Sequence, residues 1–442
     1  MKRGLLACGL LVACAPPVEP NFEAVRERVA ARAGAPPLWN RGGPEERLIE
    51  ETVRELLAAP LDLDRAVKIA LIHSPELQAK FAALGVAEAD LAAASALANP
   101  KIGVGLGLRA DASGGPIVQG GFALGLASML TLSARRAITA ERRSELELSL
   151  THAVLERVAE VKEAYLAVQR TTALVDLADE ESHAIDAVVD ATAVREQDGT
   201  LDPAEARRVL ARLELERHAR LDADLALVAA RERLNRLLGL WGGAIAWKLA
   251  EPLRGVPSDE VPLDRLESHA ISARLDLEAA KHRTATVART LAAEGDLGWL
   301  RSLDAGALVR LEEGGSPYVG PSFEIELPVF DQGQSRIARL RNELLQRRFE
   351  VTELAVSIRS RVREEREALV AARRRVVHLR EAVLPMLEDL TRVAVGASPE
   401  ARAHGAEGRR AALGARRELV RALEEYWRAR FRLERTVGGR LP

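Results

Sequence analysis

The side chains that could perform catalysis are scattered along this 442-residue sequence. None of its eight histidines has another histidine four residues away, so no helix face offers zinc a histidine pair. Gly103, Gly105 and Gly107 alternate with other residues and do not form a dinucleotide-binding loop. Neither a phosphate-binding loop nor a G-x-S-x-G nucleophile motif is present. We therefore expect no enzymatic activity, no metal site and no cofactor.

Cys14 is the residue whose chemistry the sequence specifies most clearly. Two basic residues precede the apolar stretch Gly4–Ala13, which is too short to cross a bilayer. The run Leu11-Val12-Ala13-Cys14 resembles the bacterial lipobox, in which cleavage precedes the cysteine and its thiol takes lipid. We expect residues 1–13 to be a lipoprotein signal peptide and Cys14 to be the lipid attachment site. An ordinary signal peptide with a chance cysteine is the alternative.

The remaining composition excludes several other classes. Cys8, the second of two cysteines, also lies in the targeting segment, so a disulfide in the mature chain is not expected. A net charge of −2, with no basic block, argues against a nucleic-acid-binding protein. Residues 14–60 contain Ala35-Pro36-Pro37 and Arg41-Gly42-Gly43-Pro44, which predict an irregular tether between a lipid anchor and a folded body.

The rest of the chain repeats itself at an offset of about 200 residues. An ordered series of matches argues for duplication of one unit. The matching positions are Leu63-Asp64-Arg65 with Leu263-Asp264-Arg265, Leu77 with Leu277, Phe122 and Leu124 with Phe323 and Ile325, Leu126 with Leu327, Arg135 and Ala137 with Arg336 and Ala338, and Gly239 with Gly438. We place the first repeat at 61–250 and the second at 251–442.

Each repeat contains two runs that alternate apolar with small or charged residues around a Gly-rich turn, the pattern of a β-hairpin. These runs lie at residues 103–108 and 121–126 in the first repeat and at 307–312 and 322–327 in the second. Four strands are too few to close a barrel, but strands pooled from several chains could do so.

The segments after the hairpins predict very long helices. Residues 134–198 contain neither Pro nor Gly, and Val154, Val158 and Val161 belong to an apolar seam at helical spacing. About 60 helical residues would extend roughly 90–100 Å. A second helix should run from Asp202-Pro203 to Leu238, and the second repeat should contain an interruption near Pro385 and a turn near residues 396–399.

Two segments carry a family resemblance. Leu327-Pro328-Val329-Phe330-Asp331, with Gly333 and Arg336-Ile337-Ala338 after it, resembles the strand-to-helix junction of TolC-like outer-membrane efflux proteins. Residues 70–77 are similar to the first helix of that family. The resemblance implies a mainly α-helical fold with long antiparallel helices forming an α-barrel, and a homotrimer whose chains each give four strands to a twelve-stranded transmembrane β-barrel.

The resemblance also implies partners and a location. It implies a lipid-anchored outer-membrane exit duct that receives substrates from a periplasmic adaptor protein and an inner-membrane pump. The family pattern of an Arg followed by a Gly at the helical tips is met by Arg195 with Gly199 and by Arg392 with Gly396, which are therefore candidates for adaptor docking. Both glycines could equally be simple turn residues.

Strand alternation suggests which charges such a pore would expose. Glu324 and Glu326 should face the lumen with Arg310 nearby. Asp198, Asp202 and Glu205 are candidates for gating contacts at the tip, although exposed acidic helix caps would have the same sequence.

Two other protein classes stay open. A periplasmic adaptor would have a single helical hairpin between β-rich domains, and a structural coiled-coil envelope protein would not need the four alternating strands.

Overall fold

The computed structural model describes residues 21–107, 117–258, 264–297, 303–311, 316–326, 329–393, 399–439 and 441. The chain divides into two compact units, each built from stretches that are distant in the sequence. The sheet unit comprises Met1–Phe22, Ala82–Leu150 and Asp276–Leu354. The helical unit comprises Glu23–Phe81, Thr151–Leu275 and Ala355–Pro442.

The same order of elements occurs twice, as the sequence repeat predicts. The first series is α3 (Leu63–His73), α4 (Pro75–Ala94), β1 (Lys101–Gly107), β2 (Ile117–Gly125), α5 (Leu126–Leu130), α6 (Leu132–Gln197) and α7 (Pro203–Leu238). The second is α8 (Leu266–Ala273), α9 (Leu275–Leu297), β3 (Leu303–Leu311), β4 (Tyr318–Ile325), α10 (Gln334–His378), α11 (Leu384–Val393) and α12 (Pro399–Val437). Leu126 begins a helix, so its prediction as a strand residue is wrong.

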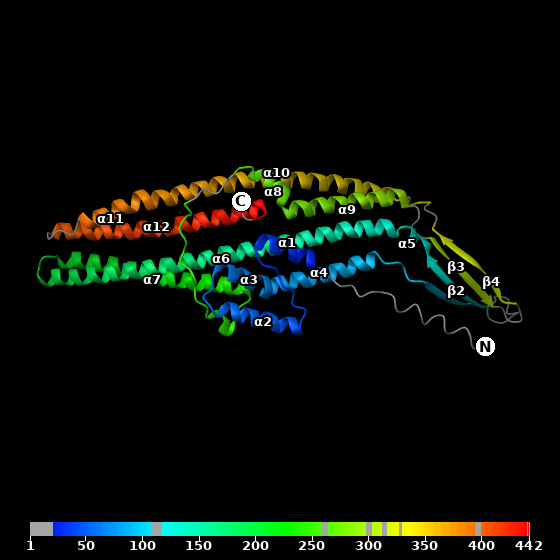
Figure 1. The fold of residues 1–442 in the computed structure, drawn as a ribbon, viewed down its shortest axis with the longest axis horizontal. Coiled ribbons are helices and arrows are strands. Elements are labelled where there is room, and N and C mark those ends of the chain that lie inside the picture. The colour runs from blue at the N-terminus through cyan, green and yellow to red at the C-terminus, as the bar shows by residue number, and fades with distance from the viewer. Residues whose placement is uncertain are drawn as a thin grey trace. The chain divides into compact units, whose positions relative to one another are not determined.

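The sheet unit contains one antiparallel sheet in the order β1-β2-β3-β4, in which β2 and β3 join the two repeats (Figure 1). The helices α4, α6, α9 and α10 of this unit are neighbours in space in that order, and an ion pair links each helix to the next. Glu88 of α4 lies 3.8 Å from Arg143 of α6, and Glu145 of α6 lies 2.7 Å from Arg283 of α9. Glu294 of α9 accepts a hydrogen bond of 2.7 Å from Arg336 of α10.

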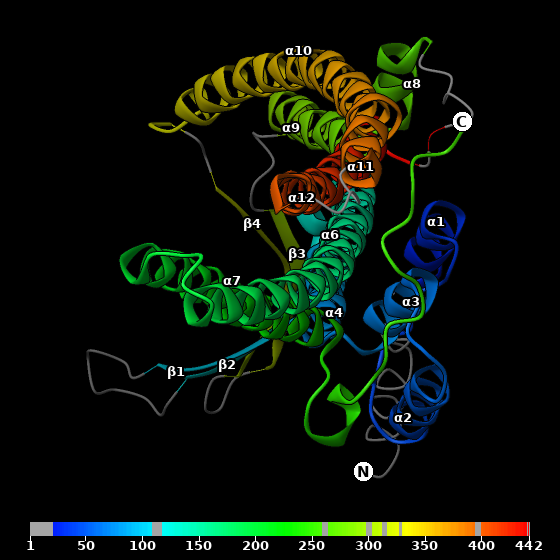
Figure 2. The same ribbon diagram turned by 90° about the vertical axis from the view of Figure 1, so that its left-hand side faces the viewer.

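In the helical unit, α6 pairs with α7 on one side and with α12 on another, and Figure 2 shows these helices end-on together with α11. The predicted seam of α6 is buried, with Val154, Val158 and Val161 at most 4% exposed. Arg170 of α6 forms an ion pair of 3.2 Å with Glu424 of α12. Apolar burial and charge pairing therefore act along the same helix–helix contact.

In both repeats a glycine ends the last long helix. Gly239 and Gly438 follow α7 and α12 with φ angles of +75° and +89°, which favour glycine. His73 Nδ1 lies 3.0 Å from the Leu238 carbonyl, and an N–H of Arg274 donates to the Thr436 carbonyl at 3.1 Å. In each repeat, a side chain at the junction of two consecutive helices (α3–α4 or α8–α9) therefore contacts a carbonyl group in the last turn of α7 or α12. Carbonyl groups in the last turn of a helix have no partner within that helix.

The predicted interruption near Pro385 is confirmed. A π-helical turn at Leu379–Val383 separates α10 from α11. Proline has no N–H to donate to the carbonyl four residues earlier, so the regular helix cannot continue unchanged through this position.

The prediction of irregular structure for the segment before residue 60 is wrong. Residues Glu23–Ala33 form α1 and Pro44–Leu57 form α2. Val25 and Val29 of α1 are fully buried, and Ile49 of α2 is 2% exposed. Glycines and prolines lie at the ends of these helices, and their presence led the sequence analysis to overlook the two short helical stretches between them. Among the described helices, none has an apolar stretch long enough to cross a bilayer.

Candidate channel-forming sheet and helical turns

The register of the four strands sorts their side chains onto two chemically different faces. Directly opposite residues of paired strands share a face, and successive residues alternate. One face, here called the apolar face, carries Ile102, Val104, Leu106, Val118, Phe122, Leu124, Ala305, Ala307, Val309, Leu311, Val319, Phe323 and Ile325. The other, the polar face, carries Lys101, Gln119, Asp304, Arg310, Tyr318, Ser322 and Glu324, together with Ile117, Leu308 and several small residues.

The apolar face is exposed in the single chain. Ile102, Val104 and Leu106 are 77–80% exposed, and Phe323 is 74% exposed. An exposed apolar surface of this kind marks contact with a partner or with lipid. Met129 and Leu130, which follow β2, and Val329 and Phe330, which follow β4, are also exposed.

The two edge strands leave the sheet open. β1 and β4 stand at the ends of the strand order, and among the described strands each pairs on one side only. An unpaired strand edge is a template for pairing with another chain. Because β1 and β4 are antiparallel neighbours of inner strands, β4 of one chain could pair with β1 of another and continue the sheet.

A row of charges crosses the polar face. Lys101 Nζ on β1 lies 2.7 Å from Asp304 Oδ2 on β3, and Glu324 on β4 stands directly opposite Asp304. The Lys101 side chain reaches across β2 to Asp304 because the β2 residues opposite these two, Ala123 and Gly125, are small.

The predicted lumen residues are partly separated. Glu324 and Arg310 lie on the same face, but Arg310 stands opposite Tyr318 at the other end of the strands. Six residues of strand, about 20 Å, separate Arg310 from Asp304, so the expectation that Arg310 lies near Glu324 is wrong. Glu326 is exposed just beyond the end of β4.

The sequence analysis missed Lys101 and Asp304. Asp304 precedes Ala305 and Ala307 at strand spacing, so its face could have been predicted. Its pairing with Lys101 depends on the register of three strands, which the sequence pattern does not fix.

Gly306 sets the spacing between the inner strands. A Cβ atom on this residue would collide with the Phe122 carbonyl oxygen on β2 and lie 2.8 Å from the Ala123 Cα. Gly103 on β1 has no heavy atom within 4 Å of its Cβ position. The close approach at the join between the repeats therefore requires glycine.

The turn between α6 and α7 contains the first set of predicted tip residues. Gly199 has a φ of +67°, so it is a turn residue. Asp202 accepts hydrogen bonds from the backbone N–H groups of Ala204 and Glu205 at 3.0 and 3.3 Å, which makes it the N-cap of α7. Asp198 and Glu205 are exposed.

Two of the other predicted tip residues lie in described helices. Arg195 lies in the last turn of α6, and Arg392 lies in α11. Gly396 and Cys14 lie outside the described residues. Docking, gating and lipidation therefore stay predictions.

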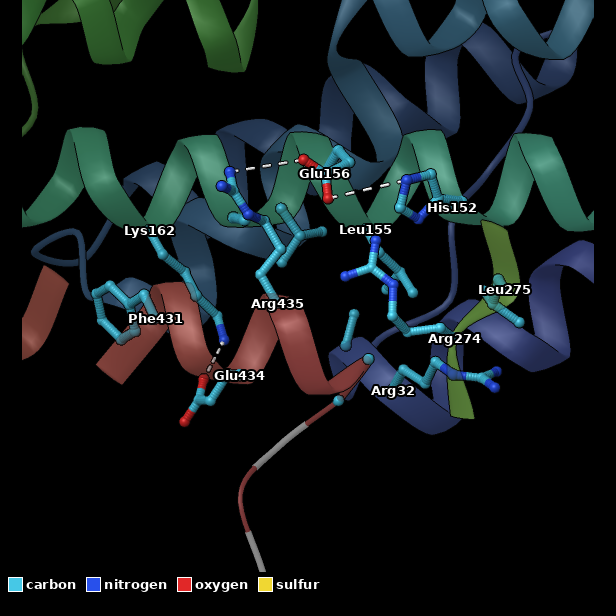
Figure 3. A pocket seen from close by; sticks show the side chains of 15 residues that line it. Arg32, His152, Leu155, Glu156, Lys162, Arg274, Leu275, Phe431, Glu434 and Arg435 are labelled. Carbon is cyan, nitrogen blue, oxygen red and sulfur yellow. Dashed lines mark hydrogen bonds and ion pairs between the residues drawn. The ribbon is translucent and has the colours of Figure 1, made fainter. Parts of the chain in front are cut away.

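A small cavity of about 70 Å³ lies in the helical unit beside the end of α12 (Figure 3). Arg435 and Lys162 bind Glu156 and Glu434 at 3.6 and 3.3 Å across its wall. The nearby ends of α1, α8 and α12 present partly negative carbonyl groups, which the basic side chains of the wall, including Arg274, neutralise. This charge balance explains the basic cluster without a ligand.

Residues 66–240 match the family model described as outer membrane efflux protein. This segment is similar to outer membrane efflux proteins. The match covers the first repeat, and the element order of the second repeat extends the same architecture. The resemblance to TolC-like outer-membrane efflux proteins is thus confirmed. No curated protein matches the sequence.

Solved structures of similar fold cover most of the chain. CusC has a TM-score of 0.69 at 15% identity over 88% of this chain and 92% of its own. A membrane protein from Pseudomonas aeruginosa has 0.70 at 17% identity over 86% and 93%. The outer membrane protein VceC from Vibrio cholerae has 0.65 at 16% identity over 86% and 97%. At these identities the likeness establishes the fold, and the predicted mainly helical class with four strands per chain is confirmed.

Proposed function

We propose that this chain is the protomer of a homotrimeric exit duct in the outer membrane. The observation that carries the proposal is the four-stranded sheet, whose apolar face is exposed and whose two edges are open. Three such sheets joined edge to edge supply twelve strands, enough to close a barrel, whereas one cannot. The apolar faces meet lipid, and the polar faces line the passage.

The duct serves a tripartite efflux or export system. Lipid on Cys14 anchors each chain, and the turns between the long helices, including Arg195 with Gly199 and Arg392 with Gly396, dock a periplasmic adaptor that connects to an inner-membrane pump. The family match over residues 66–240 supports a role in efflux. Asp198, Asp202 and Glu205 contribute contacts that close the passage.

Passage is governed by size and charge. The row formed by Lys101, Asp304 and Glu324 places two acids and one base per chain on the polar face, and Glu326 adds a third acid beyond it. A trimer repeats this row three times around the passage, so its charge favours cations.

The deciding experiment is planar-bilayer conductance of the purified, detergent-extracted protein, with the oligomer mass measured in the same detergent. Trimers with discrete conductance steps are expected. Monomers without conductance would contradict the proposal and favour the periplasmic adaptor or the structural coiled-coil class.

A further inference from the structure

A buried carboxylate on α4 has no role in the proposed passage. Glu88 is 2% exposed, although the residues around it in α4 include the exposed Asp90. A buried carboxylate is costly unless hydrogen-bond donors or a positive charge compensate it. Its partners therefore indicate why the chain keeps an acid at this position.

Its hydrogen-bond donor comes from the beginning of the described chain. The backbone N–H of Asn21 donates to Glu88 Oε2 at 3.1 Å. Arg143 Nε on α6 lies 3.8 Å from Oε1, close enough for an ion pair but too far for a hydrogen bond. Within the described part of the chain, the buried Oε1 receives no hydrogen bond. The Asn21 amide thus gives this carboxylate a hydrogen bond at Oε2.

We propose that Glu88 is the docking site of this chain's own N-terminal arm, defined here as residues 14–21. The inference rests on the proposed lipid anchor at Cys14. The charged acceptor makes a stronger hydrogen bond to the peptide N–H than a neutral group would. Arg143 places a positive charge 3.8 Å from the other carboxylate oxygen, Oε1.

The length of the arm fits this role. Cys14 lies seven positions before Asn21, and at 3.3–3.6 Å per residue this stretch reaches at most about 25 Å. From Glu88, α4 continues for six residues to Ala94, which is about 9 Å. β1 then begins at Lys101. A lipid on Cys14 can therefore enter the bilayer at the level where the apolar face of the sheet begins.

Docking at Glu88 limits where the anchor can go. Without it, the arm would lose this point of attachment, and its reach would lengthen. With it, the acyl chains stay beside the sheet of their own chain. Glu88 is thus a positioning residue for the lipid anchor, independent of the passage.

The test is the mobility of a nitroxide attached to the arm of the full-length acylated protein, carried by Glu19→Cys. This thiol is the only reactive one in the mature chain if Cys14 is acylated. Glu88→Gln keeps an oxygen acceptor and should leave the nitroxide slow, whereas Glu88→Leu should speed its rotation several-fold. Asn21→Pro removes the N–H without altering the core and should act like Glu88→Leu, while Asn21→Ala keeps the N–H and should act like the parent protein. Asp90→Leu, on the exposed side of α4, is the helix control.

Equal mobility in all variants would overturn the proposal. A mobile arm in Glu88→Leu but not in Asn21→Pro would overturn the assignment of the Asn21 amide as the docking group. Intact mass measured on the same samples reports acylation separately. An unacylated chain with a docked arm would refute the lipid anchor of the proposed function and the role of Glu88 in positioning it, while leaving the contact itself in place.

Discussion

Asp304 and Glu324 stand directly opposite each other on the polar face of β3 and β4. Two acids at a cross-strand pair repel each other unless a cation lies close, and Lys101 supplies it from β1. The arrangement concentrates charge at one end of the strands, on the face that the proposed passage would use.

We expect Glu324→Gln combined with Glu326→Gln to reduce the cation preference of the reconstituted channel, because both changes remove negative charge from that end of the polar face. The measurement is the reversal potential in a KCl gradient. Glu50→Gln combined with Glu51→Gln, at exposed sites of α2, is the matched control and should change nothing. Unchanged selectivity in the double variant would refute the assignment of the polar face to the lumen.

Gly306→Ala should disrupt the pairing of β2 with β3, since the new methyl group would collide with the Phe122 carbonyl. Overpacking of this kind costs about 1–3 kcal/mol. Gly103→Ala has free space around it and should be tolerated. We expect a loss of heat-resistant trimers on gels for Gly306→Ala alone; equal trimer yields would argue against the register described here.

Sequence patterns predicted the long elements well and the short contacts poorly. The bounds of α7 follow from Asp202-Pro203 at one end and Gly239 at the other, which are local signals. The face of Glu324 follows from alternation alone. The pairs Lys101 with Asp304 and Asn21 with Glu88 join residues that are 203 and 67 positions apart, so only the folded chain reveals them. For the same reason α1 and α2 were missed, because their stability comes from buried Val25, Val29 and Ile49.

Gly239→Ala should destabilise the protein more than Gly199→Ala. Both glycines have positive φ, so each substitution costs about 1–2 kcal/mol from the left-handed conformation. At Gly239 the Cβ would also lie 2.6 Å from Pro75 Cδ and 3.0 Å from the His73 carbonyl oxygen, whereas Gly199 is in open space. Thermal unfolding of the two variants should therefore differ, with the lower midpoint for Gly239→Ala. Equal midpoints would mean that the α3–α4 junction shifts to accommodate the added methyl group with little loss of stability.

Tyr165 should make stability depend on alkaline pH. Its hydroxyl donates to the Leu61 carbonyl at 3.0 Å, and burial raises the pKa of Tyr165 to about 12 from 10.0. The folded state thus binds the phenol proton more tightly than the unfolded state. The corresponding stabilisation is complete below pH 10 and is lost as the pH rises from about 10 to about 12.

The check is to compare the parent protein with Tyr165→Phe in urea between pH 8 and pH 11. The variant should lose about 1 kcal/mol at pH 8 because the Leu61 carbonyl loses its donor. This gap should narrow above pH 10, where only the parent protein carries the phenol. A constant gap across the range would show that Tyr165 titrates normally.

The exposed stripe on α7 provides a direct test of assembly. Leu221, Leu225 and Val228 follow helical spacing and are 58–69% exposed in the single chain. A neighbouring chain that continues the helical layer would cover them, as it would continue the sheet at β1 or β4. Leu225→Glu would then bury an unpaired charge and should shift the mass in detergent from trimer toward monomer. Ala226→Glu places the same charge at the next position of the helix, about 100° away, and should keep the trimer. If both variants remain trimeric, this stripe is not a contact between chains.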